Sequence, residues 1–152
     1  MTLMRHGWGK PGSAFIDAFA ALFIPDGNRE QTASLVELQH QTTSPENAVA
    51  LRAAVDRLDV GDLLRAVDVP TLVLHSRHDA VQPLDQGRQL ALRIPGAEFA
   101  MLESRNHMIL PQEKAWPILF ERLERFILGA PDPAAPPRHG EGFQESPDIT
   151  MI

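Results

Sequence analysis

The first 68 residues carry apolar side chains at helical spacing, interrupted by residues that begin or end helices. Ser13 is suited to cap a helix that the Pro25-Asp26-Gly27 turn would end. Between them lies one apolar stripe, formed by Phe15, Phe19, Leu22 and Phe23. Packing in the core is the expected role of the phenylalanines, and lining a substrate pocket is the alternative.

Two further helices are predicted before residue 68. Asn28 can cap the second helix with Gln31 as its capping-box partner, and Ser44-Pro45 can begin the third. The apolar positions are Leu35 and Leu38 in the second helix, and Ala48, Leu51, Val55 and Leu58 in the third. These helices are small and amphipathic, so each needs another element to pack against.

Residues 69–128 follow a different pattern, which predicts strand, helix, strand and helix. Residues 71–74 form an apolar run without alternation, which is typical of a strand buried on both faces of a parallel sheet. A helix over residues 84–94 and a strand over 98–102 follow. The last helix carries its apolar stripe at Trp116, Leu119, Leu123, Phe126 and Ile127. The fold class is therefore α/β, with a βαβα unit whose parallel strands are joined by a right-handed crossover.

Composition narrows the class of protein further. The chain of 152 residues is long enough for one domain with a buried core, and its net charge of −6 argues against a nucleic-acid-binding surface. It contains no cysteine, which excludes disulfides and thiolate metal sites. No apolar run approaches the roughly 20 residues that span a bilayer, and Met1–Gly7 lacks the apolar core of a secretion signal. A cytoplasmic protein without a membrane or nucleic-acid partner is expected.

The last residues differ from the rest in composition. Prolines are dense from Gly129 to Pro137, and mostly polar residues follow to Ile152. Because so many prolines disfavour both helices and sheets, we expect a disordered tail or linker over residues 129–152. The chain is thus divided into a helical segment (1–68), a βαβα unit (69–128) and this tail.

Two residues in predicted loops are candidates for a catalytic pair. Asp79 lies just past the first predicted strand, and His107 lies just past the second. Parallel strands about 4.8 Å apart bring the loops at their carboxyl ends together. An aspartate that accepts the Nδ1 proton of a histidine fixes its tautomer, which leaves Nε2 free to deprotonate a hydroxyl nucleophile. We therefore predict that Asp79 and His107 are the catalytic residues.

The residues of these loops also allow other interpretations. Taken alone, Asp79 would be a turn or cap residue, and His107 would be a hydrogen-bonded loop histidine. His75 and His78 flank the same loop, but their spacing matches no standard zinc pattern, so no metal and no cofactor are expected. Asp85 could rival Asp79 as the acid, although its position suits the beginning of the following helix.

The βαβα unit resembles the C-terminal third of an α/β-hydrolase. The matching stretches are Val69–Asp79, Ile94–Ala97 and Leu102–His107. The resemblance implies that Asp79 is the acid and His107 the base of a Ser-His-Asp triad, in the chain order Ser, Asp, His. It also implies that the helical segment is a cap remnant, and that the complete protein hydrolyses an ester or lactone bond in a small apolar substrate.

Two departures from the family pattern shape the expected activity. The chain contains no Gly-x-Ser-x-Gly, and the resemblance places that motif before the cap, upstream of Met1, so we expect the chain alone to be nearly inactive. His107 follows Ser104-Arg105-Asn106 instead of Gly-x-Gly, which resembles hydrolase-like domains joined to signalling or transcription-regulator modules. A non-catalytic module that senses a small ligand, or a truncated remnant, is the alternative.

The small number of predicted strands indicates which protein partners the chain could have. Two predicted strands leave sheet edges unpaired, and unpaired edges are templates for association. A second copy of the chain, or a complementing N-terminal half, is the expected protein partner.

Overall fold

The computed structural model describes residues 2–8, 10 and 12–129. Its elements in chain order are α1 (Thr2–Gly7), α2 (Ala14–Phe23), α3 (Arg29–Thr42), α4 (Pro45–Val55), the 3-10 helix η1 (Gly61–Ala66), β1 (Leu72–Ser76), α5 (Leu84–Arg93), β2 (Glu98–Leu102) and α6 (Ala115–Leu128). The predicted order, helices followed by a βαβα unit, is confirmed, with α1 and η1 as additions. Of the tail predicted to be disordered, residues 130–152 lie outside the described residues.

The sheet consists of β1 and β2, which pair in parallel with Ser76 opposite Leu102 at their carboxyl ends. The pairing continues beyond the strands. The Arg77 N–H donates to the Leu102 carbonyl at 2.9 Å, and the His78 N–H donates to the Ser104 carbonyl at 3.0 Å. The two segments that leave the strands are therefore held side by side before either loop begins.

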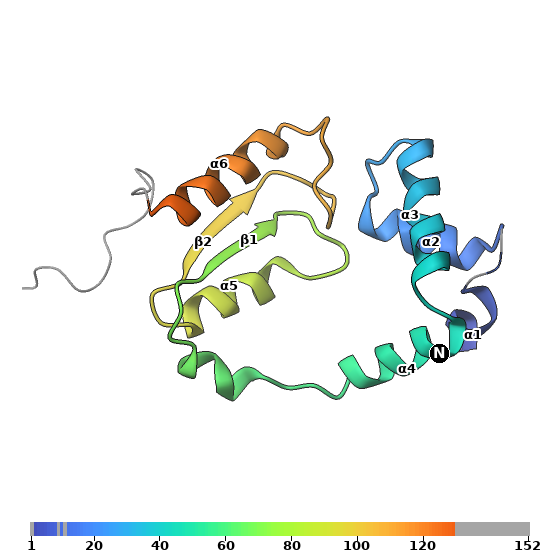
Figure 1. Ribbon diagram of the computed structural model, residues 1–152, viewed down its shortest axis with the longest axis horizontal. Helices are drawn as coiled ribbons and strands as arrows, with labels where there is room; N and C mark the ends of the chain where they lie inside the picture. The colour runs from blue at the N-terminus through green and yellow to red at the C-terminus, as the bar shows by residue number, and fades with distance from the viewer. Residues whose placement is uncertain (1, 9, 11, 130–152) are drawn as a thin grey trace, which may run out of the picture.

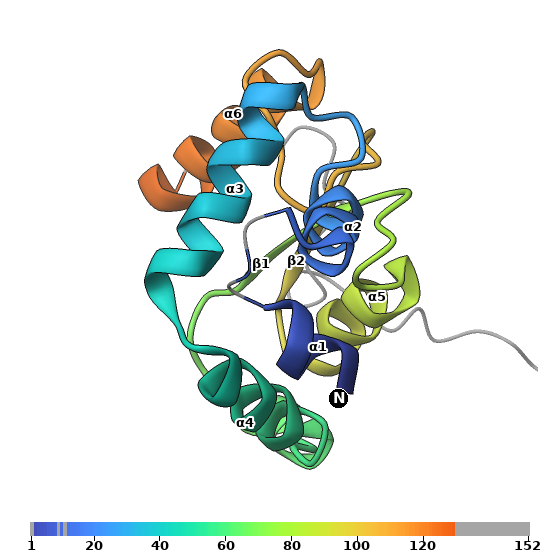
Figure 2. The same ribbon diagram turned by 90° about the vertical axis from the view of Figure 1, so that its right-hand side faces the viewer.

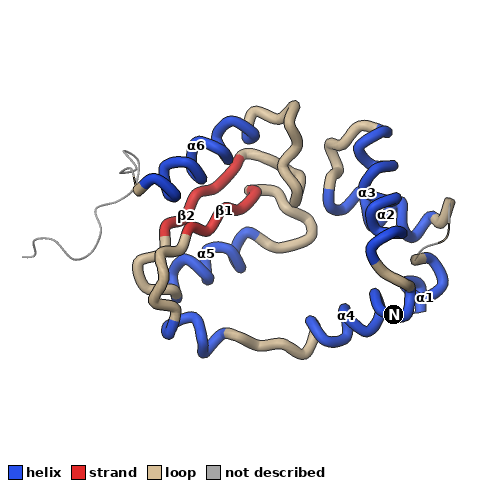
Figure 3. The backbone as a smooth tube through the Cα atoms, viewed as in Figure 1, coloured by secondary structure: helices blue, strands red, loops and turns tan. Residues whose placement is uncertain are grey.

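The sheet lies between two helices, with α5 on one face and α6 on the other (Figures 1 and 3). Helix α5 approaches β1 closely because Gly87 has no side chain: a Cβ at this position would lie 2.4 Å from Cδ2 of His75. On α6 the rings of Trp116 and Phe120 make an edge contact at 4.8 Å. The helix ends at Gly129, whose φ of 68° lies in the left-handed region that favours glycine.

The helical segment α1–α4 lies on the side toward which both strands point, and it stands in front of them when viewed from that side (Figures 1 and 2). Its core contains Trp8, Ile16 and Ala48, and Ile16 is completely buried. The rings of Trp8 and Phe19 meet in a T-shaped arrangement with their centroids 5.5 Å apart. The segment thus has a small apolar core of its own, in front of the carboxyl ends of the strands.

The predicted helix caps are largely confirmed. Asn28 and Gln31 form the capping box of α3, with reciprocal hydrogen bonds of 2.9 and 3.0 Å. Ser44 accepts the Asn47 N–H at the start of α4, where Pro45 is the first helical residue. Ser13 precedes α2 as predicted, but its side chain makes no capping hydrogen bond.

The predicted apolar faces are partly wrong. In α2 the buried residues are Ile16 and Ala20, and Leu22 is 50% exposed. In the third predicted helix Ala48 is buried as expected, whereas the other apolar positions are exposed, namely Leu51, Val55 and Leu58. Because each helix is short, the neighbours it packs on decide which face is buried, and periodicity alone does not identify them.

Replacing Ile16 tests where the core of the helical segment lies. We expect Ile16→Ala to lower the free energy of unfolding by about 2–5 kcal/mol, because it leaves a cavity at a completely buried site. Leu22→Ala, on the same helix but half exposed, is the matched control and should change it by no more than about 0.5 kcal/mol. Chemical denaturation of both variants measures the difference, and equal losses would place the core elsewhere.

Candidate active site

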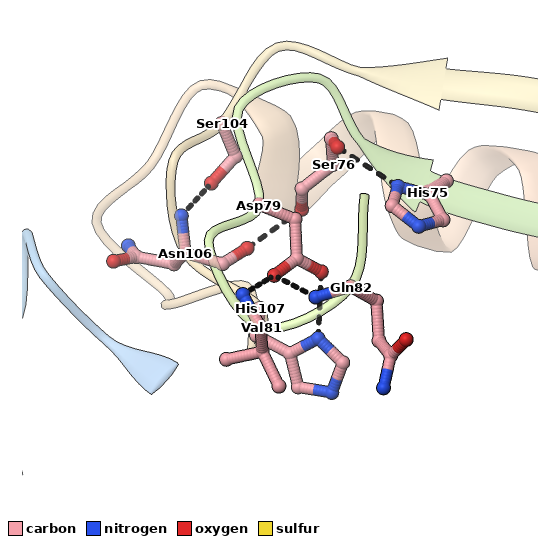
Figure 4. A network of polar contacts seen from close by, with 8 residues as sticks. All are labelled: His75, Ser76, Asp79, Val81, Gln82, Ser104, Asn106 and His107. Carbon is pink, nitrogen blue, oxygen red and sulfur yellow. Dashed lines mark hydrogen bonds and ion pairs between the residues drawn. The ribbon is translucent and has the colours of Figure 1, made fainter. Parts of the chain in front are cut away.

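Asp79 and His107 meet at the carboxyl ends of the two strands (Figure 4). Oδ2 of Asp79 lies 2.6 Å from Nδ1 of His107, although the two residues are 28 positions apart in the chain. The Asp79 side chain is only 3% exposed and that of His107 is 34% exposed. The structure therefore brings the two sequence-predicted site residues into direct contact, with the carboxylate buried and the imidazole at the surface.

A tight turn after β1 fixes the carboxylate. Oδ1 of Asp79 accepts the main-chain N–H of Val81 at 2.7 Å and that of Gln82 at 3.1 Å. This is the way in which aspartate stabilises turns, by hydrogen bonding to its own backbone two or three residues on. Because Oδ1 is occupied, Oδ2 is left to face the imidazole, so the turn role and the pairing role of Asp79 coexist.

The surroundings of Asp79 favour its charged form. Burial raises the pKa of this carboxyl, but the hydrogen bond from His107, the backbone N–H groups of Gln82 and Val81, and the attraction of a charged imidazole lower it. The net result is a pKa below the ordinary value of 3.8. An ionised carboxylate at this position is what a histidine needs to keep its proton on Nδ1.

The end of α2 holds the other side of His107. The Phe23 carbonyl accepts the main-chain N–H of His107 at 2.8 Å and that of Met108 at 3.3 Å. The Phe23 ring meets the imidazole edge-on, with centroids 5.2 Å apart and an interplanar angle of 89°. No hydrogen bond joins Nε2 to another described residue, so this nitrogen is available for a reacting group.

The residues just before His107 belong to a buried polar cluster that the sequence does not predict. Asn106 is completely buried, and its amide donates to Glu113 at 2.7 Å. Glu113 also accepts the main-chain N–H of Leu110 at 2.6 Å. Glu113 lies three residues after Leu110, but a leucine has no capping side chain and Glu113 precedes the helix, so no capping-box pattern in the sequence marks this contact.

A cavity of about 380 Å³ opens beside the pair. Asp79 and His107 line it together with polar residues of the turn and of α5, including Gln82 and Gln86. Aliphatic side chains make up much of the remaining wall, namely Leu74, Leu90, Leu102, Ile109 and Leu119. The acid and the base thus lie at a mostly apolar hollow, which is the usual setting of a small-molecule site.

The other candidates from the sequence lie away from this contact. The His75 ring packs on α5, and its Nδ1 is 2.9 Å from the Ser76 carbonyl. His78 faces Glu103 at the surface. Within the described ranges, no group of three or more His, Asp or Glu side chains could hold a metal ion. Asp85 pairs with Arg88 in the first turns of α5, so it does not rival Asp79.

The hydroxyls near the site have structural partners. The Ser76 hydroxyl donates to the main-chain carbonyl of Asn106 at 2.6 Å, and the Ser104 hydroxyl donates to Glu113. Among the described residues, none places a hydroxyl in hydrogen-bond contact with Nε2 of His107. The part of the chain that the structure describes therefore supplies an acid and a base, and it brings no serine to them.

The parallel strands flanked by helices, with an acid and a histidine at their carboxyl ends, define part of an α/β-hydrolase fold. Solved structures support this class. A hydrolase from Oleispira antarctica matches with a TM-score of 0.64 and 21% identity over 81% of this chain and 44% of its own. The esterase RhEst1 from a Rhodococcus species matches with a TM-score of 0.64 and 22% identity over 86% of this chain and 48% of its own. The predicted fold is confirmed.

Sequence comparison gives a similar result. The RutD protein of Serratia proteamaculans, which is provisionally named a carbamate hydrolase, is 29% identical over 121 residues, or 76% of this chain. Est816, described as an N-acyl homoserine lactone degrading enzyme, has a TM-score of 0.53 and 23% identity over 80% of this chain. No family model matches the chain. The chain spans 43% of RutD and 53% of Est816, about half of each relative.

The described residues contain no helix long and apolar enough to cross a membrane.

The lowered pKa of Asp79 predicts how stability depends on pH. A carboxyl whose pKa is lower in the folded than in the unfolded state stabilises the fold above its unfolded pKa. That stabilisation is lost as the pH falls from about the ordinary 3.8 through the lower folded value. We expect Asp79→Asn to lower the free energy of unfolding near neutral pH. The difference in this free energy between the variant and the original protein should shrink as the pH falls below about 3.8.

Denaturant titrations at several pH values measure this effect. Asp85→Asn is the matched control, because the Asp85 side chain is 86% exposed and its ion pair with Arg88 lies at the surface. The control should follow the original protein at all pH values. A constant difference between Asp79→Asn and the original protein down to the most acidic buffer would contradict the pKa assignment.

Proposed function

We propose that Asp79 and His107 are the acid and base of an α/β-hydrolase that cleaves an ester or lactone bond. The observation that carries the proposal is the 2.6 Å contact between Oδ2 of Asp79 and Nδ1 of His107, which leaves Nε2 without a partner among the described residues. This is the geometry of a histidine prepared to act as a general base. The hydrolase and esterase relatives support the reaction class.

In the proposed reaction His107 acts twice. Its Nε2 accepts the proton of a serine hydroxyl while the serine oxygen attacks the acyl carbon, and it then returns this proton to the leaving alcohol. In the second half water attacks the acyl carbon and loses a proton to the same nitrogen. The bond between the acyl carbon and the serine oxygen then breaks, the serine takes that proton back from Nε2, and the carboxylic acid leaves. Asp79 stays ionised throughout and stabilises the imidazolium that forms in each half.

The serine of this proposal comes from polypeptide outside the described residues. The described serines near the site, Ser76 and Ser104, donate their hydroxyls to a carbonyl and a carboxylate. The substrate should be small and largely apolar, because a cavity of about 380 Å³ with leucine and isoleucine walls adjoins the pair. The sequence contains no Gly-x-Ser-x-Gly, and a histidine–acid pair without a nucleophile cannot perform covalent acyl transfer, so we propose that residues 1–152 are inactive alone.

An ester assay of the chain tests this inactivity. We expect the chain and its His107→Ala variant to hydrolyse p-nitrophenyl acetate at rates within about twofold, because loss of a triad serine alone costs roughly six orders of magnitude in related chemistry. His78→Ala, which removes an exposed histidine of the neighbouring loop, is the control for background imidazole catalysis. A rate that falls at least tenfold in His107→Ala alone would show that the chain carries its own nucleophile.

The reading frame before Met1 distinguishes the hydrolase from the alternatives. An in-frame Gly-x-Ser-x-Gly segment, whose joined product hydrolyses the ester and loses this activity in His107→Ala, would support the proposal. A signalling or transcription-regulator domain in frame, with an inactive joined product, would favour the ligand-sensing module. A stop codon directly before Met1 would favour the remnant.

A further inference from the structure

Asn106, the residue before His107, is a junction between three parts of the molecule. It is completely buried, and its side-chain and main-chain polar groups are all engaged. Its side-chain oxygen accepts the Asp26 N–H at 2.9 Å, and its amide donates to Glu113 at 2.7 Å. Its main-chain N–H donates to the Ser104 hydroxyl at 2.9 Å, and its carbonyl accepts the Ser76 hydroxyl at 2.6 Å.

Glu113, two residues before α6, completes this cluster. Its Oε1 accepts the amide of Asn106 and the main-chain N–H of Leu110, and its Oε2 accepts the Ser104 hydroxyl. The residues on either side of His107 are therefore tied to one carboxylate. A loop held in this way has little freedom to move the backbone of its central residue.

The helical segment contacts the same loop through the corner after α2. The Phe23 carbonyl accepts the His107 N–H, and the Asp26 N–H donates to Asn106. Arg105 forms an ion pair with Asp26 at 2.9 Å beside them. The corner thus bonds to Arg105, Asn106 and His107, and of these three Asn106 is the buried residue.

We propose that Asn106 is a positioning residue: it holds the His107 imidazole on Asp79 and couples that contact to the docking of the helical segment. The inference rests on the proposed role of the Asp79–His107 pair. One hydrogen bond joins the imidazole to Asp79, and the ring is one-third exposed, so the backbone of His107 must be fixed by other groups. A histidine proton settles on the nitrogen whose partner accepts it, so a displaced ring loses its tautomer.

Imidazole ¹⁵N resonances of the full chain test the proposal without need of activity. The chain has six histidines, and comparison with a His107→Gln variant assigns the signals of residue 107. In mildly alkaline buffer, where histidines are neutral as a rule, we expect the original protein to show the Nδ1–H tautomer at this residue. In Asn106→Ala the ratio of Nε2–H to Nδ1–H should rise about fivefold, the change expected when the one hydrogen bond between Nδ1 of His107 and Asp79 is lost.

A charge exchange provides a second test should Asn106→Ala fail to fold. Asn106→Asp places a second carboxylate against Oε1 of Glu113 and should raise the Nε2–H share in the same way. Adding Glu113→Gln restores a donor–acceptor pair with the amide and carboxylate exchanged, and should lower that share again. The recovery should be partial, because the Leu110 N–H then faces the NH₂ group of the new glutamine instead of a carboxylate oxygen.

Two controls separate the possible failures. Gln112→Ala removes a neutral amide of the same loop that also bonds to the helical segment, through Gln31 at 2.9 Å, and should leave the tautomer unchanged. Asp79→Asn should abolish the Nδ1–H preference. If it does not, the proposed acid–base pair itself fails. If Asp79→Asn changes the tautomer while folded Asn106→Ala and Asn106→Asp do not, the positioning role of Asn106 is overturned and the pair stands.

Discussion

The hydrogen bond between Asp79 and His107 depends on the parallel pairing of β1 with β2. Because Ser76 lies opposite Leu102, the segments after both strands begin at the same edge of the sheet, and two further main-chain hydrogen bonds keep them together. A slip of one residue in this register would move the acid along the sheet relative to the base and turn each side chain to the other face. The chemistry of the site is therefore a consequence of strand register.

The second requirement is a rigid histidine loop, which two distant parts of the chain share. Glu113, two residues before the last helix, accepts hydrogen bonds from Ser104, Asn106 and Leu110. The corner after α2 supplies a carbonyl and an N–H. Buried polar groups are costly unless they are paired, so such a cluster favours one arrangement of the loop. The helical segment is thus part of the site, because its end bonds to the backbone of His107.

The sequence predicts the elements of the βαβα unit and the contact of Asp79 with His107, because strand pattern and chain order determine both. It does not predict the cluster around Asn106, because the Asp26 N–H that Asn106 accepts is 80 residues away, and the contacts of Glu113 with Ser104 and Asn106 depend on how the loop between them folds. The faces of α2 and α4 are also missed in part. Short helices bury whichever side meets a neighbour, so Leu22 and Leu51 remain exposed despite suitable spacing.

A double-mutant cycle measures whether Asp79 and His107 interact in the folded chain. The free energies of unfolding of Asp79→Asn, His107→Gln and the double variant would be compared with that of the original protein near neutral pH. Direct contact between the two side chains predicts an interaction energy of about 0.5–3 kcal/mol. Additivity within about 0.3 kcal/mol, equal to that of the distant pair Asp85→Asn and His107→Gln, would contradict it.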